Sequence, residues 1–160
     1  MLKTFLLLTA TLLFAIPVSA ADSTWDQNVR QGKAYEITVY HSPTCGCCSN
    51  WIAHLEKHGF KVTSIKTDNV QKVKQQQKLP ALAASCHTAL VEGYLIEGHV
   101  PANDIKNLIE SGDKTIRGLS VPAMPAGTPG MEMGGRKDAF DVVSFDESAK
   151  ISIYHHYADY

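Results

Sequence analysis

Beyond its first 20 residues, the sequence has no apolar run long enough to span a bilayer. It also has no cluster of basic residues, no acidic tail and no internal repeat. With 15 lysine and arginine residues against 16 aspartate and glutamate residues, the formal net charge is only −1. These absences argue against a membrane span in the mature chain, against a nucleic-acid partner and against a repeat architecture.

The first 20 residues have the pattern of a secretory signal peptide. Lys3 provides a positive start, an apolar run extends from Leu6 to Ile16, and Val18-Ser19-Ala20 provides small residues for a signal peptidase. A membrane anchor is the alternative, but the run is short for a spanning helix. We therefore expect cleavage before Ala21, a periplasmic location and a single domain over residues 21–160.

Strand and helix patterns alternate in the mature part of the sequence in the order β-α-β-α-β-β-α. Strands are expected at 35–40, 61–66, 89–91 and 94–96, and helices at 47–58, 68–77 and 101–109. Gly59 and Gly112 end the first and last helices, Asp68 caps the second, and Glu92-Gly93 forms a tight turn. This order is typical of a thioredoxin-like α/β fold, although a fold alone does not define a function.

Residues 118–135 are rich in glycine, proline and methionine, and we expect them to form a long loop. Loops of this length in compact domains are usually functional or disordered. Strand patterns return at 140–145 and 151–154 and predict a C-terminal β extension. The histidine pair His155-His156 follows the last of these strands; it either binds copper(II) or is simply solvated.

Three cysteines gather in Cys45-Gly46-Cys47-Cys48, between the first expected strand and the first expected helix. The amide N–H groups and the dipole at a helix N-terminus favour thiolates there, and Gly46 lets the backbone turn closely. In an oxidising compartment, four cysteines can form two disulfides, and Cys45 and Cys48 have the spacing of a redox pair. Three converging thiolates suit a soft metal ion better, such as copper(I), zinc or an iron–sulfur cluster.

The fourth cysteine, Cys86, lies just before the third expected strand, in Ser85-Cys86-His87-Thr88. In a thioredoxin-like fold this segment packs against the start of the first helix, so we expect Cys86 to join the other three cysteines. His87 occupies the position at which thioredoxins carry a cis-proline, and the loss of that proline is expected to open the site to metals. The sequence therefore predicts a metal site made by four cysteines.

Other soft or borderline ligands are secondary candidates, and ordinary packing is the alternative for each of them. These secondary candidates are His87, His41, His99, Met124, Met131 and Met133. The three methionines are expected either to fold over the metal with their loop or to pack without a ligand role. His54 and His58 have the i, i+4 spacing of a helical metal site, but no acidic partner is placed with them on that face of the helix, so we expect an exposed helix face.

Several motifs together resemble the CopG-like periplasmic copper-resistance family. They are Thr44-Cys45-Gly46-Cys47-Cys48 with Trp51, Ser85-Cys86-His87-Thr88, Glu97-Gly98-His99-Val100-Pro101, the segment from Gly118 to Pro125, and Gly130-Met131-Glu132. The resemblance covers about residues 36–133 and implies an exported, thioredoxin-like protein associated with copper resistance. It also implies that Cys45, Cys47, Cys48 and Cys86 hold copper, including a multinuclear copper(I)–thiolate cluster. His155 and His156 lie outside the matched part.

We therefore expect a periplasmic protein that holds copper(I), with more than one copper ion per chain and a contribution to copper resistance. Its expected partners are copper ions and other copper-resistance or copper-export proteins. Storage, delivery as a chaperone and interconversion of copper(I) and copper(II) by a copper oxidoreductase all stay open. The alternatives are a thiol–disulfide oxidoreductase using Cys45 and Cys48 and a zinc site.

Overall fold

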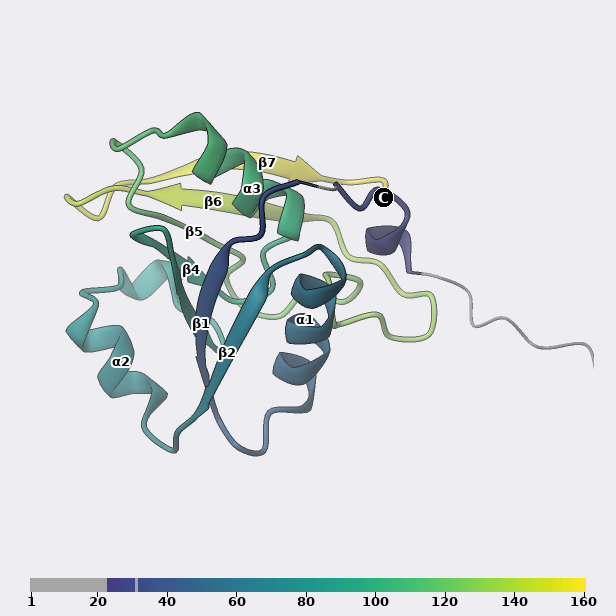
Figure 1. Cartoon of the computed structure of the whole chain (residues 1–160), viewed down its shortest axis with the longest axis horizontal. Helices are drawn as coiled ribbons and strands as arrows, with labels where there is room; N and C mark the ends of the chain where they lie inside the picture. Colours follow the sequence, from purple (N-terminus) through teal and green to yellow (C-terminus); the bar gives the residue numbers. More distant parts are fainter. Residues whose placement is uncertain (1–22, 31) are drawn as a thin grey trace, which may run out of the picture.

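The computed structural model describes residues 23–30 and 32–160, so the expected signal peptide lies outside the described residues. One mixed sheet of seven strands runs through the described part of the chain, in the order β2-β1-β3-β4-β5-β6-β7 (Figure 1). The strands are β1 (Glu36–His41), β2 (Lys61–Lys66), β3 (Thr88–Val91), β4 (Tyr94–Glu97), β5 (Gly118–Ser120), β6 (Phe140–Phe145) and β7 (Ile151–Tyr157). The helices are α1 (Gly46–Lys57), α2 (Val70–Gln76) and α3 (Ala102–Ser111), with short 3₁₀ turns η1 (Thr24–Asp26) and η2 (Ala81–Ala83).

The predicted order of strands and helices is present up to α3, with boundaries shifted by only one or two residues. Gly59 and Gly112 follow α1 and α3 with φ values of 80° and 64°, the left-handed conformation that ends a helix. The predicted cap of α2 is wrong by one residue. Asn69, not Asp68, accepts a hydrogen bond from the Lys72 amide, because α2 begins only at Val70.

The expected loop at 118–135 begins with a strand instead. β5 (Gly118–Ser120) pairs parallel to β4 and antiparallel to β6, and all three of its residues are buried. A strand this short has no clear alternation in the sequence, so only its two neighbours define it. The C-terminal β extension is confirmed as β6 and β7, but β7 continues to Tyr157. His155 and His156 therefore belong to the last strand of the sheet, not to a tail after it.

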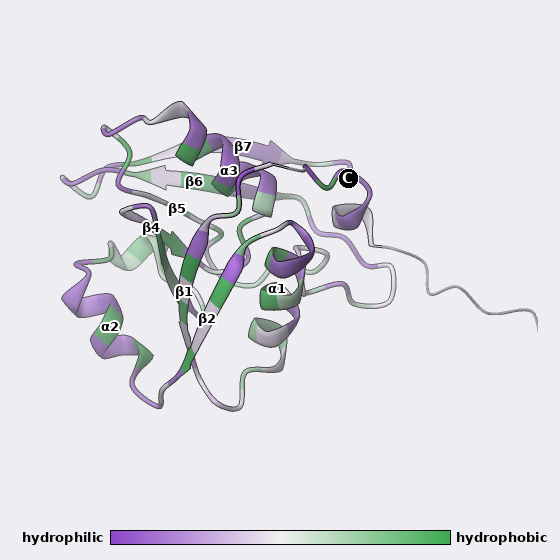
Figure 2. Ribbon diagram, viewed as in Figure 1, coloured by the Kyte–Doolittle hydropathy of each residue, from purple (hydrophilic) through white to green (hydrophobic). Residues whose placement is uncertain are grey.

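Helices cover both faces of the sheet. On one face, Trp51 and Leu55 of α1 and Ile105 and Leu108 of α3 pack against alternate residues of the central strands and are completely buried. On the other face, Leu79 and Ala83 near α2 and η2 pack against the intervening residues, such as Leu90 and Leu95. In Figure 2, β1 carries green segments while most of α2 is purple. Burying each large apolar side chain contributes roughly 1.5–3 kcal/mol.

The strand pairing decides which loops meet. β1 and β3 are antiparallel neighbours, with Tyr40 opposite Thr88. The last residues of β1 therefore lie beside the first residues of β3. The turn that leads from β1 into α1 and the segment that leads into β3 consequently meet at one edge of the sheet (Figure 1). Among the helices of the described residues, none has the length and hydropathy needed to cross a bilayer.

Candidate metal centre

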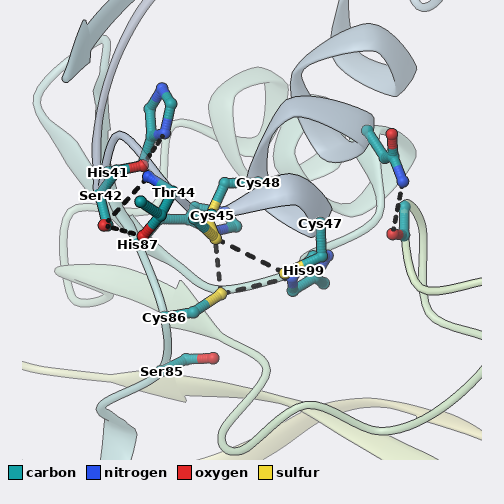
Figure 3. The surroundings of a disulfide bond; sticks show 12 residues. His41, Ser42, Thr44, Cys45, Cys47, Cys48, Ser85, Cys86, His87 and His99 are labelled. Carbon is teal, nitrogen blue, oxygen red and sulfur yellow. Dashed lines mark hydrogen bonds between the residues drawn. A yellow bond between two sulfur atoms is a disulfide. The ribbon is translucent and has the colours of Figure 1, made fainter.

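All four cysteines meet at this edge of the sheet. The sulfur atoms of Cys45, Cys47, Cys48 and Cys86 all lie within 4.8 Å of one another. The first three come from the start of α1 and the fourth comes from the segment before β3 (Figure 3). The structure therefore brings Cys86 to the other three cysteines. Four sulfur donors in so small a volume are the ligand set that soft ions prefer.

In this structure the site is partly oxidised. Cys45 and Cys48 form a disulfide, while Cys47 and Cys86 are free thiols. The Sγ atom of Cys47 lies 3.5 Å from that of Cys45. The pairing of Cys45 with Cys48, which the spacing left open, is thus compatible with the fold. A site with four thiolates requires that this disulfide be reduced.

The start of α1 explains how three cysteines aim at one point. Cys45 is the N-cap residue and Gly46 is the first helical residue, so the chain turns sharply into the helix. The first N–H groups of a helix have no partner within it, and the helix dipole favours negative charge there. Cys48 is fully buried, whereas Cys45, Cys47 and Cys86 are partly exposed. An incoming ion can therefore reach the site from one side.

Cys86 has a different electrostatic environment from a helix-start cysteine. Burial, followed by the neighbouring Cys47, raises the pKa of the Cys86 thiol to about 11. Cys86 is therefore protonated at neutral pH in the absence of metal. A metal ion bound there must displace this proton, so metal affinity at this position should fall as the pH falls.

His99 is oriented like a metal ligand. Its Nδ1 atom lies 2.8 Å from the Pro129 carbonyl oxygen, which can only accept a hydrogen bond, so Nδ1 carries the proton. The other ring nitrogen, Nε2, is then unprotonated, and it lies within hydrogen-bond distance of Cys86 Sγ, at 3.3 Å. Histidine ligands commonly donate their second ring N–H to a carbonyl or carboxylate in this way. The sequence had His99 among its secondary candidates, and the geometry is compatible with that role.

His87 also approaches Cys86, with its Nδ1 atom 3.1 Å from the sulfur. Its ring is fully buried and packs against Trp51, with the ring centroids 4.3 Å apart. Burial, then nearby His99, keeps the pKa of His87 well below its usual value, so the ring is neutral. The Nε2 atom of His87 finds no hydrogen-bond partner among the described residues. Packing and a ligand role are both compatible with this arrangement.

His41 is not brought into the site. Its Nδ1 atom lies 3.0 Å from the Ser42 carbonyl oxygen and its Nε2 atom lies 2.8 Å from Ser64 Oγ. Both ring nitrogens are therefore used in hydrogen bonds, and the ring is buried. Within residues 23–30 and 32–160, His41 does not belong to any group of atoms that could share an ion.

The glycine- and methionine-containing segment after β5 packs over α1. Residues 126–130 are buried, and an added Cβ atom at Gly130 would meet the Trp51 amide nitrogen at 2.5 Å. The segment thus holds Pro129 against His99. Its methionine side chains are less involved, since Met124 and Met133 are 53% and 61% exposed. Ligation by Met124, Met131 or Met133 stays a prediction.

A second group of polar side chains lies at the other end of α1. The expectation that His54 and His58 form an exposed helix face is wrong, because both rings are buried. They pack against each other and against Asp26 of η1, and three of their potential ligand atoms lie within 4.8 Å of one another. The acidic partner missing from this face of the helix is supplied by a segment nearly thirty residues earlier.

The position of the protons makes this second group a poor metal site. His54 Nε2 accepts a hydrogen bond from the Ala102 amide, so the proton of the neutral ring is on Nδ1. That Nδ1 atom faces Asp26 Oδ1 at 3.9 Å and has no lone pair to offer an ion. Burial, then neighbouring His58, lowers the pKa of His54 to about 3, so the ring stays neutral. His54 instead satisfies an amide at the start of α3, which is a structural role.

Sequence reasoning missed a buried polar network that contacts Ser85 and Thr88, on either side of Cys86. Glu97 and Lys74 form an ion pair that is almost completely inaccessible to solvent. The Glu97 carboxylate also accepts hydrogen bonds from the Ser85 amide at 2.7 Å and from Thr88 Oγ1 at 2.7 Å. A glutamate directly after the apolar run Tyr94-Leu95-Ile96 was the signal in the sequence, since a buried strand seldom ends in an unpaired charge.

Comparisons with known proteins found one family model and two similar solved structures. A family model described as "Protein of unknown function, DUF411" matches residues 83–131. Two solved structures are similar along most of the chain. Both are named copper resistance protein CopG, as form 2 and form 1, and both are 42% identical to this sequence. Each match covers 79% of this chain and 100% of the other, with TM-scores of 0.75 and 0.74. No curated protein sequence matches significantly.

Proposed function

The chain belongs to the family of copper resistance protein CopG, and from this membership we propose that it binds copper(I) in the periplasm and contributes to copper resistance. The ligands are the four cysteines, with His99 as an additional ligand. The observation that carries the proposal is the convergence of four sulfur atoms from two distant segments. Thiolates favour copper(I) over harder ions.

The number of sulfur donors supports a site for several copper ions. A single copper(I) ion is satisfied by two or three thiolates, so four thiolates within 4.8 Å of one another are more than one ion needs. Thiolate sulfur can bridge two ions. We therefore expect more than one copper(I) ion in the reduced protein.

The disulfide supports a redox role for the same residues. When the two thiolates of Cys45 and Cys48 join as a disulfide, they lose two electrons in total. Two copper(II) ions take up one electron each and become two copper(I) ions, so the electrons balance. Any proton still on these sulfurs is released to solvent. Cys47 and Cys86 remain as thiols that hold the copper(I) product.

The fold and the first residues support the remaining details. Parallel pairing of β1 with β2 and antiparallel pairing of β1 with β3 and of β3 with β4 support a thioredoxin-like core. The signal-peptide pattern of residues 1–20 supports export to the periplasm, with a mature domain over residues 21–160. Other copper-resistance or copper-export proteins are the expected partners.

Anaerobic titration of the mature protein with copper(I) tests the proposal. After reduction, we expect binding of more than one copper per chain and a matching loss of thiols that react with a thiol reagent. After oxidation to the Cys45–Cys48 disulfide, we expect a lower capacity. Saturation of the reduced protein at one copper would contradict a multinuclear site. Absence of copper binding in both states would contradict the function itself.

A thiol–disulfide oxidoreductase is the second candidate, favoured specifically by the Cys45–Cys48 disulfide at the start of α1. It predicts catalytic reduction of a protein disulfide in the presence of a thiol reductant and a defined dithiol potential. We expect copper(I) to inhibit any such turnover, because the same thiolates bind the ion. Efficient turnover combined with no copper binding would favour this second function.

A further inference from the structure

The buried carboxylate of Glu97 holds the backbone of the segment that carries Cys86. Glu97, the last residue of β4, is fully buried, and its carboxylate receives three donors from three segments of the chain. These donors are the Ser85 amide, the Thr88 hydroxyl and the Lys74 ammonium of α2. Lys74 also donates to Thr88 Oγ1 at 3.0 Å, which closes the network.

Ser85 comes directly before Cys86 and His87 comes directly after it. Three hydrogen bonds hold these two residues in place. The Glu97 carboxylate holds the Ser85 amide, and Ser85 Oγ donates to the Ala123 carbonyl oxygen at 2.6 Å. The His87 carbonyl oxygen, just after Cys86, accepts from the Gly98 amide at 3.0 Å. Gly98 leaves room for this packing, since an added Cβ atom would meet Ser85 Oγ at 2.5 Å. Among these contacts, the one to Glu97 involves a charge.

A buried carboxylate is costly unless its donors are well placed. A hydrophobic pair in the same volume would stabilise the fold about as well, so stability alone does not account for the choice of Lys74 and Glu97. The carboxylate does offer what an apolar side chain cannot, namely a strong acceptor for the Ser85 amide. The fixed position of this amide in turn fixes the backbone from which the Cys86 side chain reaches the other three sulfurs.

We propose that Glu97, held by Lys74, is a positioning residue for Cys86 and sets how tightly the four-cysteine site binds copper(I). This inference rests on the proposed copper-binding function. The hydrogen bonds of Glu97 go to Ser85, Thr88 and Lys74 and not to a sulfur atom, and its positioning effect passes through the Ser85 amide. Partners that orient metal ligands in this way typically change affinity by about 10- to 100-fold when they are removed.

The first test replaces the whole charged pair so that the fold survives. The double variant Lys74→Met with Glu97→Leu removes both charges together and leaves the Ser85 amide without its acceptor. We expect a copper(I) affinity about 10- to 100-fold weaker than wild type, measured by chelator competition under anaerobic conditions. Lys74→Arg keeps the cation and should retain most of the affinity. The control is Asp104→Asn, which changes another buried carboxylate, one that accepts from His155 and Tyr157 away from the cysteines.

The second test asks whether the effect passes through Cys86. In a Cys86→Ser background, the Lys74→Met and Glu97→Leu replacements should cause no further loss of copper affinity. The same fold-loss in that background would overturn the inference. So would an unchanged affinity in a double variant that retains Cys86, or an equal loss in Asp104→Asn.

A third measurement needs no metal. With Cys45 and Cys48 paired, oxidation of Cys47 and Cys86 to a disulfide in a glutathione buffer reports how often the two sulfurs meet. We expect a weaker tendency to form this bond in the double variant than in wild type. An equal tendency would overturn the positioning role. Because this readout is independent of copper, failure of the inference and failure of the proposed function are distinguishable.

Discussion

Helix α1 begins at a group of four cysteines and ends beside a group of one aspartate and two histidines. In both groups, atoms of the kinds that bind metals lie within 4.8 Å of one another. The two groups differ in whether their atoms have a lone pair available for a metal ion. Once the Cys45–Cys48 disulfide is reduced, each cysteine sulfur can lose a proton and offer its electrons to an ion, and His99 already presents an unprotonated nitrogen to Cys86. At the other end, the nitrogen of His54 that faces Asp26 carries the ring proton.

This comparison shows that convergence of ligand atoms is not sufficient for a metal site. A nitrogen or sulfur atom can bind a metal ion only if it has a lone pair to offer, and the hydrogen bonds of the fold decide which ring nitrogen carries the proton. The backbone carbonyl of Pro129 directs the His99 proton away from the cysteines, whereas the backbone amide of Ala102 directs the His54 proton into its own group. Experiments at the two ends of α1 can therefore test whether only the cysteine group binds copper.

Loss of a cysteine ligand should have the largest effect. Cys86→Ser removes the sulfur that comes from the segment before β3 and not from the start of α1. We expect copper(I) affinity to fall by more than about 100-fold, since even outer partners contribute 10- to 100-fold. Copper capacity should fall as well. His58→Gln, at the other end of α1, should bind as much copper as wild type. Unchanged stoichiometry and affinity in Cys86→Ser would contradict the convergence of four ligands.

Removal of the His54 ring should reduce stability and leave copper binding intact. His54→Leu keeps a similar volume but leaves the buried Ala102 amide without an acceptor, which costs about 1–3 kcal/mol. Urea unfolding of the metal-free protein measures this loss. The control is His156→Gln, because His156 is exposed and its loss should change stability little. A loss of copper capacity in His54→Leu would show that the two ends of α1 are not independent.

His99→Gln should weaken copper(I) binding by about tenfold, or roughly 1.4 kcal/mol. The change removes the nitrogen aimed at Cys86 and keeps the four sulfurs. Chelator competition measures the affinity, and X-ray absorption of the copper-loaded protein should show fewer nitrogen neighbours. An affinity equal to that of wild type would mean that His99 serves only to hold Pro129.

The smallest effect is a pH dependence of stability that comes from His54. Its folded pKa of about 3 lies below the ordinary value of 6.5, so only the unfolded chain binds a proton at this residue between these values. The stability that His54 contributes is therefore complete above about pH 6.5 and is lost as the pH falls towards 3. Between pH 7 and pH 6 the loss is roughly 0.7 kcal/mol. The difference in unfolding free energy between pH 7 and pH 6 should be smaller by this amount in His54→Leu than in wild type. The same pH dependence in both proteins would show that the His54 ring is not held neutral.

Much of the fold could be predicted, because local patterns define most of it. Alternating apolar residues in β1, the helical spacing of Trp51 and Leu55, and the glycines after α1 and α3 all act within a few residues. β5 was missed because a three-residue strand has no pattern of its own and exists through its pairing with β4 and β6. Burial of His54 and His58 was missed because η1, which covers them, lies far away in the sequence.

For the site, the sequence determined which atoms are available. The motif Cys45-Gly46-Cys47-Cys48 predicted a cluster of sulfurs at a helix start, because short spacing and helix geometry are local properties. Only the tertiary structure decided how those atoms are used. The antiparallel pairing of β1 with β3 brings Cys86 to the cluster, and buried Glu97 holds its backbone. Hydrogen bonds to Pro129 and Ala102 set the ring protons of His99 and His54. Contacts between distant segments decide these properties, and a one-dimensional pattern cannot show which segments will meet.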